Sequence, residues 1–278
     1  MKITLWGARG DVSAIHPDRS RYGVSTPCVL VEHSDADPII LDGGIGLHWL
    51  GNALMAGAFG KGQGRAQLFF SHTNWCHIQG VPFFVPLLIP GNSIRLCGGG
   101  SAHSTKQLLL EQMRSTYCPV PDFFQDGIGA HVDVCDLDTE PLQIGPLSVE
   151  HQEVGAFHGA QRLGFRISDG ANTLAYIPAI EYVDDALQDR AEALARDADL
   201  LIHDAYYTDA ELAAQKGAGH SCPAQALQTA RRANAKRLVL FNHHPERTDD
   251  ALDAAAQHLA KSDLPVEFGR EKSEYSVG

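Results

Sequence analysis

The chain lacks long apolar runs, an excess of basic charge and a secretory signal, and each absence excludes a class of protein. No run of about 18 or more apolar residues occurs in its 278 residues, so we expect no membrane-spanning helix. Its 22 Lys and Arg residues face 34 Asp and Glu residues, and no local basic patch is present, so we expect no binding to a nucleic-acid duplex. Residues 1–7 have the pattern of a strand and not of a signal peptide, which predicts a cytoplasmic protein.

Paired cysteine spacings are also missing. Six cysteines lie far apart along the chain, namely Cys28, Cys76, Cys97, Cys118, Cys135 and Cys222. In a cytoplasmic protein such cysteines are usually reduced and pack as small hydrophobic side chains, which we predict for all except Cys76. Cys76 lies among histidines and is a candidate metal ligand.

Short apolar, β-branched runs alternate with helical patterns along the whole chain. Strands are predicted at 3–6, 28–32, 39–42, 67–71, 94–97, 147–151, 163–168, 173–177, 200–203 and 237–241. Helices are predicted at 106–114, 186–196, 224–234 and 250–259, begun by the caps Ser104, Asp184, Ser221 and Thr248. This order predicts two β-sheets packed face to face with helices outside. No repeat or linker divides the chain, so we expect one domain over residues 1–278, with 119–138 as an inserted loop near the site.

The predicted strand at 67–71 opens into a loop with two histidines and a cysteine, His72-Thr-Asn-Trp-Cys76-His77. Imidazole and thiolate are preferred zinc ligands, so this loop is a candidate metal site. It resembles the HxHxDH signature of the metallo-β-lactamase superfamily. Other segments resemble its phosphodiesterase-like and ribonuclease-Z-like branch, in the same order over nearly the whole chain: WGARG at 6–10, LDGGIG at 41–46, IQGVPFF at 78–84, HGAQRLGFR at 158–166, DLLIHDA at 199–205, GHS at 219–221 and LFNHHP at 240–245.

The resemblance implies an αββα sandwich of two mixed sheets, with the termini in different halves and a two-metal hydrolytic site at one edge. Of seven implied ligand positions, three keep the usual residue, namely His72, His77 and His158. Four differ, namely Asn74 for His, Cys76 for Asp, Ala179 for the bridging Asp, and Asn242 for His. The first metal would use positions 72, 74 and 158, and the second positions 76, 77 and 242. Because the methyl group of Ala179 cannot ligate a metal, we expect no two-metal centre.

Three alternatives remain for the metal. The site holds no functional metal, and its histidines make only structural hydrogen bonds. A single divalent metal, zinc above all, is held by His72, Cys76, His77 and His158, since thiolate is a strong zinc ligand. As a third alternative, His243 or His244 replaces the ligand lost at position 242 through a shift of one residue.

The resemblance also implies a catalytic pair. Asp204 matches an acidic residue that orients a histidine, and His220 matches that histidine, which protonates the leaving group or binds phosphate. A carboxylate beside an imidazole raises the imidazole pKa and keeps it protonated near neutral pH. The alternative is that His220 only precedes the helix cap at Ser221.

Three further residues receive supporting roles. Asp42, between a strand and Gly43-Gly44, is either a hydrogen-bond partner for the histidine loop or an ordinary turn residue. Arg9 and Arg166 lie in segments that resemble the family, and we predict that they support the fold.

Three functions follow from these residues. The first is a weak phosphodiester-type hydrolase with one metal. At least one metal is needed, because a general base alone accelerates a reaction only about 10²–10⁴-fold. The second is a non-catalytic ligand-binding or regulatory protein that keeps the pocket. The third is a metal or redox sensor that uses the Cys76 thiolate. In each case we expect a small-molecule ligand or substrate, anions included, and a homodimer as the default assembly.

Overall fold

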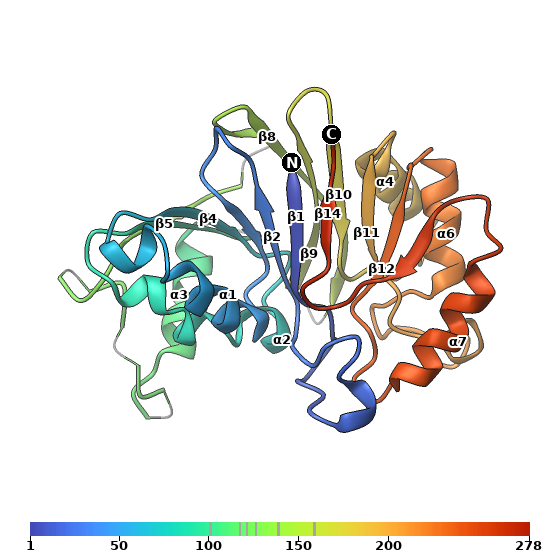
Figure 1. The fold of residues 1–278 in the computed structure, drawn as a ribbon, viewed down its shortest axis with the longest axis horizontal. Helices are drawn as coiled ribbons and strands as arrows, with labels where there is room; N and C mark the ends of the chain where they lie inside the picture. The colour runs from blue at the N-terminus through green and yellow to red at the C-terminus, as the bar shows by residue number, and fades with distance from the viewer. Residues whose placement is uncertain (100–101, 117, 121, 126, 138–139, 158–159) are drawn as a thin grey trace.

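The computed structural model describes residues 1–278 except 100–101, 117, 121, 126, 138–139 and 158–159. Within the described residues, two seven-stranded sheets face each other, and helices cover both outer sides (Figure 1). This arrangement confirms the predicted αββα sandwich. None of the described helices is both long and apolar enough to cross a membrane.

The elements are named here in chain order. The strands are β1 (Lys2–Gly7), β2 (Cys28–Glu32), β3 (Ile39–Leu41), β4 (Arg65–Phe69), β5 (Ser93–Cys97), β6 (His131–Cys135), β7 (Leu142–Ile144), β8 (Leu147–Phe157), β9 (Ala160–Ser168), β10 (Thr173–Ile177), β11 (Leu200–Asp204), β12 (Leu238–Phe241), β13 (Val266–Phe268) and β14 (Glu274–Ser276). The α-helices are α1 (Gly46–Leu54), α2 (Trp75–Ile78), α3 (Ala102–Gln112), α4 (Asp185–Ala195), α5 (Asp209–Leu212), α6 (Pro223–Arg232) and α7 (Asp249–Leu259). Four short 3₁₀ helices are η1 (Pro17–Arg19), η2 (Phe59–Lys61), η3 (Val81–Phe83) and η4 (Val85–Leu88).

Both sheets are mixed. The first has the order β14-β1-β2-β3-β4-β5-β6 and is parallel from β3 to β6. The second has the order β13-β12-β11-β10-β9-β8-β7 and is parallel from β10 to β13. The prediction that the termini lie in different halves is wrong, because β14 pairs with β1 in the first sheet (Figure 1). This pairing covers the edge of β1, whose backbone would otherwise be exposed.

The main core lies between the sheets, where apolar side chains of alternating strand positions meet. Phe69 of β4 meets Phe165 of β9 edge to face, with ring centroids 5.6 Å apart. On the outer side of the second sheet, α4 and α6 present alanines such as Ala191 and Ala230 to the strands. These short side chains let the helices approach the sheet closely.

The predicted helix starts are partly confirmed. Asp184 caps α4 and Thr248 caps α7, each accepting a backbone N–H of the first turn. Ser104 is not a cap, because α3 already begins at Ala102. Ser221 is not a cap either, since Cys222 is the N-cap of α6 and the Ser221 hydroxyl bonds to Asp204.

Segment 119–138 was predicted as a loop, but its last part is the edge strand β6. Strand β6 pairs in parallel with β5, and this register places Cys97 opposite Cys135. The two cysteines form a disulfide, so the prediction that they are reduced is wrong. Their pairing depends on the register of two strands that are 38 residues apart at the cysteines. The other four, Cys28, Cys76, Cys118 and Cys222, are free and buried, as predicted for three of them.

Candidate functional site

The histidine loop follows β4 and is held by Asp42, which follows the neighbouring strand β3. The Asp42 carboxylate accepts hydrogen bonds from the Ser71 backbone N–H at 2.8 Å, from the Ser71 hydroxyl at 2.8–2.9 Å and from the Tyr176 hydroxyl at 2.7 Å. His77 Nδ1 lies 2.8 Å from Asp42 Oδ2, the oxygen that the Tyr176 hydroxyl also contacts, and both side chains of the pair are buried. Asp42 is therefore the hydrogen-bond partner that the sequence proposed, and it fixes the orientation of the His77 ring.

The pKa values of the two histidines, His72 and His77, are shifted in opposite directions. Their ring centroids lie 3.9 Å apart. Burial lowers the pKa of His77, but Asp42 and Cys76 outweigh burial and raise it to about 10. Burial, together with the positive charges of His77, Arg162 and His220, holds the pKa of His72 well below 6.5. His77 is thus an imidazolium at neutral pH, and His72 is a neutral imidazole.

The second side of the site is formed by Asp204 and His220. Asp204 ends β11, and its Oδ1 lies 3.1 Å from His220 Nδ1. Its Oδ2 accepts the backbone N–H and the hydroxyl of Ser221, at 2.6 and 2.9 Å. The Tyr206 ring stacks on the His220 ring with a centroid distance of 4.4 Å. The predicted pair is therefore in contact, and its catalytic role stays a prediction.

Two of the four altered positions, Asn242 and Ala179, differ in what their side chains contact. Asn242 follows β12, and its side-chain amide donates to Asp204 Oδ1 at 3.0 Å and lies 3.4 Å from His220 Nδ1. Asn242, one of the altered positions that the resemblance implies, therefore contacts both members of the Asp204–His220 pair. Ala179 is buried and offers only a methyl group.

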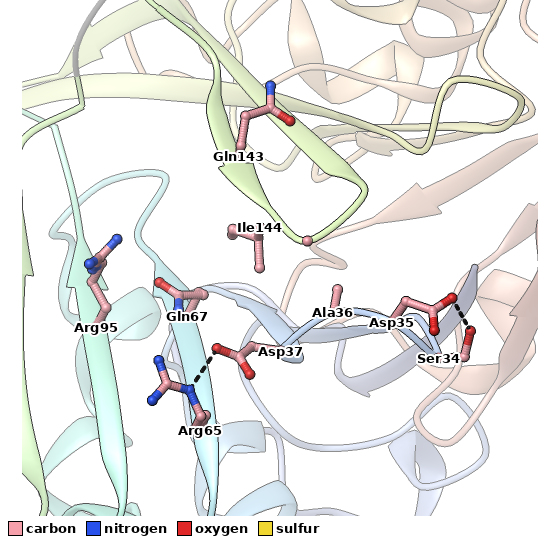
Figure 2. Close-up of a pocket in the computed structure, with 10 residues that line it drawn as sticks. Ser34, Asp35, Ala36, Asp37, Arg65, Gln67, Arg95, Gln143 and Ile144 are labelled. Carbon is pink, nitrogen blue, oxygen red and sulfur yellow. Dashed lines mark hydrogen bonds and ion pairs between the residues drawn. The ribbon is translucent and has the colours of Figure 1, made fainter.

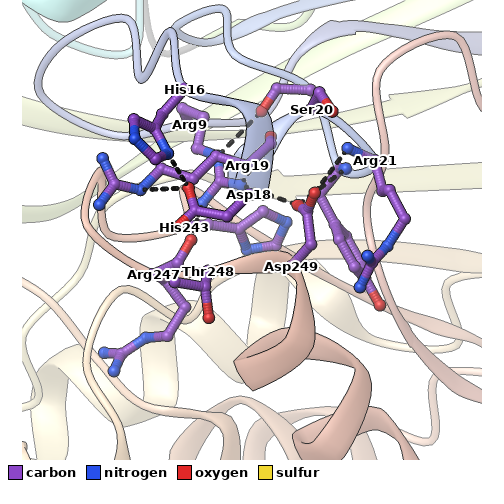
Figure 3. A network of polar contacts seen from close by, with 12 residues as sticks. Arg9, His16, Asp18, Arg19, Ser20, Arg21, His243, Arg247, Thr248 and Asp249 are labelled. Carbon is purple, nitrogen blue, oxygen red and sulfur yellow. Dashed lines mark hydrogen bonds and ion pairs between the residues drawn. The ribbon is translucent and has the colours of Figure 1, made fainter.

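His243 and His244, the alternative ligands for position 242, both contact other residues in the structure. Its Nε2 lies 2.8 Å from the Gly269 carbonyl, and its ring packs against Tyr22 and Phe268 in the interior. Figure 3 shows it beside the network around Arg9. His244 makes aromatic contacts with Tyr206, at a centroid distance of 4.7 Å. The alternative in which His243 or His244 serves as a ligand stays a prediction.

Arg9 and Arg166 support the fold through backbone carbonyls. Arg9 is fully buried, donates to the carbonyls of Gly23 and Arg247, and forms an ion pair with Asp249 (Figure 3). It thereby ties the loop after β12 to the N-terminal loop. Arg166 donates to carbonyls at the C-terminal end of α4, at 2.7 and 2.9 Å.

The described donors do not fit a two-metal centre. His72 lies in the loop after β4, and Cys76 and His77 lie in the short helix α2 that follows, while His158 is outside the described residues. Among the residues that the structure describes, no three His, Cys, Asp or Glu side chains are placed so as to hold a metal ion.

Sequence reasoning missed Arg162 and Glu181. Arg162 on β9 is only 2% exposed, and its guanidinium donates to the Gly219 carbonyl, next to His220. Glu181 accepts the backbone N–H groups of Gly217 and Gly219, at 2.6 and 2.7 Å. Arg162 could have been found from the sequence, because it is a charged residue within a segment that resembles the family, four positions after His158.

A large polar cavity lies at the other end of the sheets. It has a volume of about 570 Å³ and is lined by Arg65, Gln67, Arg95 and Gln143, among others (Figure 2). Arg65 begins β4, whereas His72 follows the end of that strand. The cavity is therefore separate from the candidate site.

Comparison with known proteins identifies the family. A family model described as a β-lactamase superfamily domain matches residues 65–244, which include the histidine loop, Asp204, His220 and Asn242. The chain belongs to the metallo-β-lactamase superfamily. No curated protein matches its sequence.

Solved structures of this superfamily share the fold over the whole chain. The metallo-β-lactamase fold protein YhfI from Bacillus subtilis has 19% identity and a TM-score of 0.70, with 100% of this chain and 99% of that chain covered. The short form of human tRNase Z has 19% identity and a TM-score of 0.64, with 100% of both chains covered. Zinc-bound PqqB from Methylobacterium extorquens has 14% identity and a TM-score of 0.68, with 99% of this chain and 100% of that chain covered. The fold of tRNase Z agrees with the branch that the motifs resemble.

Proposed function

We propose that this protein keeps the pocket of a metal-dependent hydrolase without its two-metal centre. In this proposal it binds a small molecule, and it hydrolyses a phosphodiester at most weakly. The observation that carries the proposal is the contact of Asn242 with Asp204 and His220. The side chain at a position where the resemblance implies a metal ligand here contacts the Asp204–His220 pair through its amide nitrogen.

The charge state of the histidine loop supports the same proposal. His77 shares a proton with Asp42 and is held as an imidazolium beside neutral His72. A metal that bound His77 through Nε2 would have to displace the Nε2 proton of this imidazolium, which makes binding weaker and dependent on pH. Without a metal, the Asp204–His220 pair alone supplies only about 3–5 kcal/mol of barrier reduction. Zinc supplies far more, because it lowers the pKa of bound water from about 15.7 to about 7.

The second candidate is a hydrolase with one divalent metal. It is favoured by the retained Asp42–His77 contact, since a carboxylate on Nδ1 orients the ring of a metal-binding histidine. Its ligands would come from His72, Cys76, His77 and His158. The sensor alternative is disfavoured by the burial of Cys76, whose side chain is mostly closed to oxidants.

Metal analysis and a phosphodiesterase assay test the proposal. We expect less than one equivalent of zinc, iron or manganese in protein purified without chelator. Turnover of a chromogenic phosphodiester should be weak, and turnover that depends on one bound metal should disappear in Cys76→Ala and His158→Ala. Two equivalents of metal would overturn the proposal, and so would robust turnover that survives both chelator and Cys76→Ala.

A matched revertant provides the positive control. The variant Asn74→His, Cys76→Asp, Ala179→Asp and Asn242→His restores the four altered ligand positions. We expect it to bind more metal and to turn over the phosphodiester faster than the natural sequence. The proposal also includes a cytoplasmic location, no binding to a nucleic-acid duplex and a homodimeric state, all of which rest on sequence reasoning.

A further inference from the structure

Arg162 lies between the two loops that form the candidate site. The next residue, Leu163, donates its backbone N–H to the Ser71 carbonyl at 2.8 Å, which fixes β9 beside the histidine loop. The guanidinium of Arg162 donates to the carbonyl of Gly219, immediately before His220. A buried guanidinium therefore contacts the residue before His220 from a strand that is hydrogen-bonded to the residue before His72.

The loop before His220 is shaped around this guanidinium. Gly219 has φ +79°, and a Cβ at this position would collide with Nη1, Nη2 and Cζ of Arg162. Glu181 holds the backbone N–H groups of Gly217 and Gly219 from the other direction. Glycine at 219 is thus required both by the backbone conformation and by the space that Arg162 occupies.

The charge of Arg162 acts on the residues that would surround a metal. Its positive charge is one of the causes that hold the pKa of His72 down. Burial lowers the pKa of Arg162 itself, while Asp204 and Cys76 oppose that shift. Arg162 therefore places a buried positive charge near residues that the resemblance implies as metal ligands.

We propose that Arg162 is the resident cation of this site and that it excludes divalent metals. The inference rests on the proposed function and adds a second cause for the absence of a metal centre. Loss of ligands alone would leave a site that binds metal ions weakly, whereas a buried cation would also repel them. A guanidinium keeps its charge at all physiological pH values, and repulsion between charges is strong where water is excluded. Replacing ligands alone should therefore restore metal binding only in part.

The test varies residue 162 in the fourfold revertant described above. Three proteins are compared, with Arg162 retained, with Arg162→Lys and with Arg162→Met. Zinc affinity is measured by competition with a chromogenic chelator, and cobalt binding by visible absorption. We expect the Met protein to bind zinc at least tenfold more tightly than both the Arg and the Lys proteins. A purely structural role of Arg162 would instead make the Lys and Met proteins alike.

The outcomes separate this inference from the proposed function. Equal affinity of the Arg and Met proteins would overturn the role of Arg162, while a metal-poor natural protein would still support the proposed function. Two metals in the natural protein would overturn both. Circular dichroism checks folding of each variant. If the revertant does not fold, Arg162→Met and Arg162→Lys in the natural sequence are compared by cobalt titration, with the same tenfold expectation and the same contradiction by equal affinities.

Discussion

Replacing Asp42 by Asn removes the charge that faces His77 and leaves the shape of the turn unchanged. Asp42 has φ +63°, a left-handed conformation that Asn also adopts readily. Both side chains of the ion pair are at most 1% exposed, so the pair is not screened by water. Breaking such a pair on one side costs roughly 3–5 kcal/mol, because the remaining charge is buried without a partner.

The pH dependence of this effect follows from His77. Its pKa is about 10 in the folded protein, because Asp42 and Cys76 outweigh burial, and 6.5 is its usual value. A pKa raised by folding stabilises the protein fully below pH 6.5, and this contribution is lost as the pH rises towards 10. By proton linkage it amounts to roughly 4 kcal/mol at pH 6.5 and roughly 1 kcal/mol at pH 9.

Urea denaturation at pH 6.5 and pH 9 measures both effects. We expect Asp42→Asn to lose several kcal/mol at pH 6.5 and much less at pH 9. Asp197→Asn is the matched control, since Asp197 also has a positive φ but is exposed. If Asp42→Asn costs no more than this control at pH 6.5, His77 is not the buried imidazolium described above.

Three other expectations concern the rest of the fold. Burial lowers the pKa of His243 to about 3, so the stability that neutral His243 contributes above pH 6.5 is lost as the pH falls towards 3. In urea denaturation, His243→Gln should reduce the fall of the unfolding free energy over this pH range by up to about 1.4 kcal/mol per pH unit. Asp249→Asn leaves the Arg9 guanidinium buried without its carboxylate and should lower the free energy of unfolding by roughly 3–5 kcal/mol. Thermal or urea unfolding measures this loss, and a loss below about 1 kcal/mol would contradict the ion pair. Thiol titration of the denatured, unreduced protein should detect four reactive thiols among the six cysteines, and six reactive thiols would contradict the disulfide. Replacing Cys97 and Cys135 by Ala should lower the free energy of unfolding by about 2–4 kcal/mol.

Local patterns were sufficient for most elements of the sandwich. Strand runs such as 28–32 and 173–177 coincide with β2 and β10, because alternating or continuous apolar residues determine which segments can be buried. The caps Asp184 and Thr248 were visible because a cap needs only its own first turn. Strand β6 was missed because its residues are only half buried at a sheet edge, so they carry no strong apolar pattern.

The sequence by itself determined the superfamily, the histidine loop, and the contact partners Asp204 and His220. These features depend on residue identity within short segments. Tertiary structure alone decided that β14 closes the sheet beside β1, that Cys97 meets Cys135, and that Arg162 reaches the loop of His220. Each of these contacts joins segments that are far apart in the chain, and strand register and burial, which no local pattern encodes, determine which side chains meet.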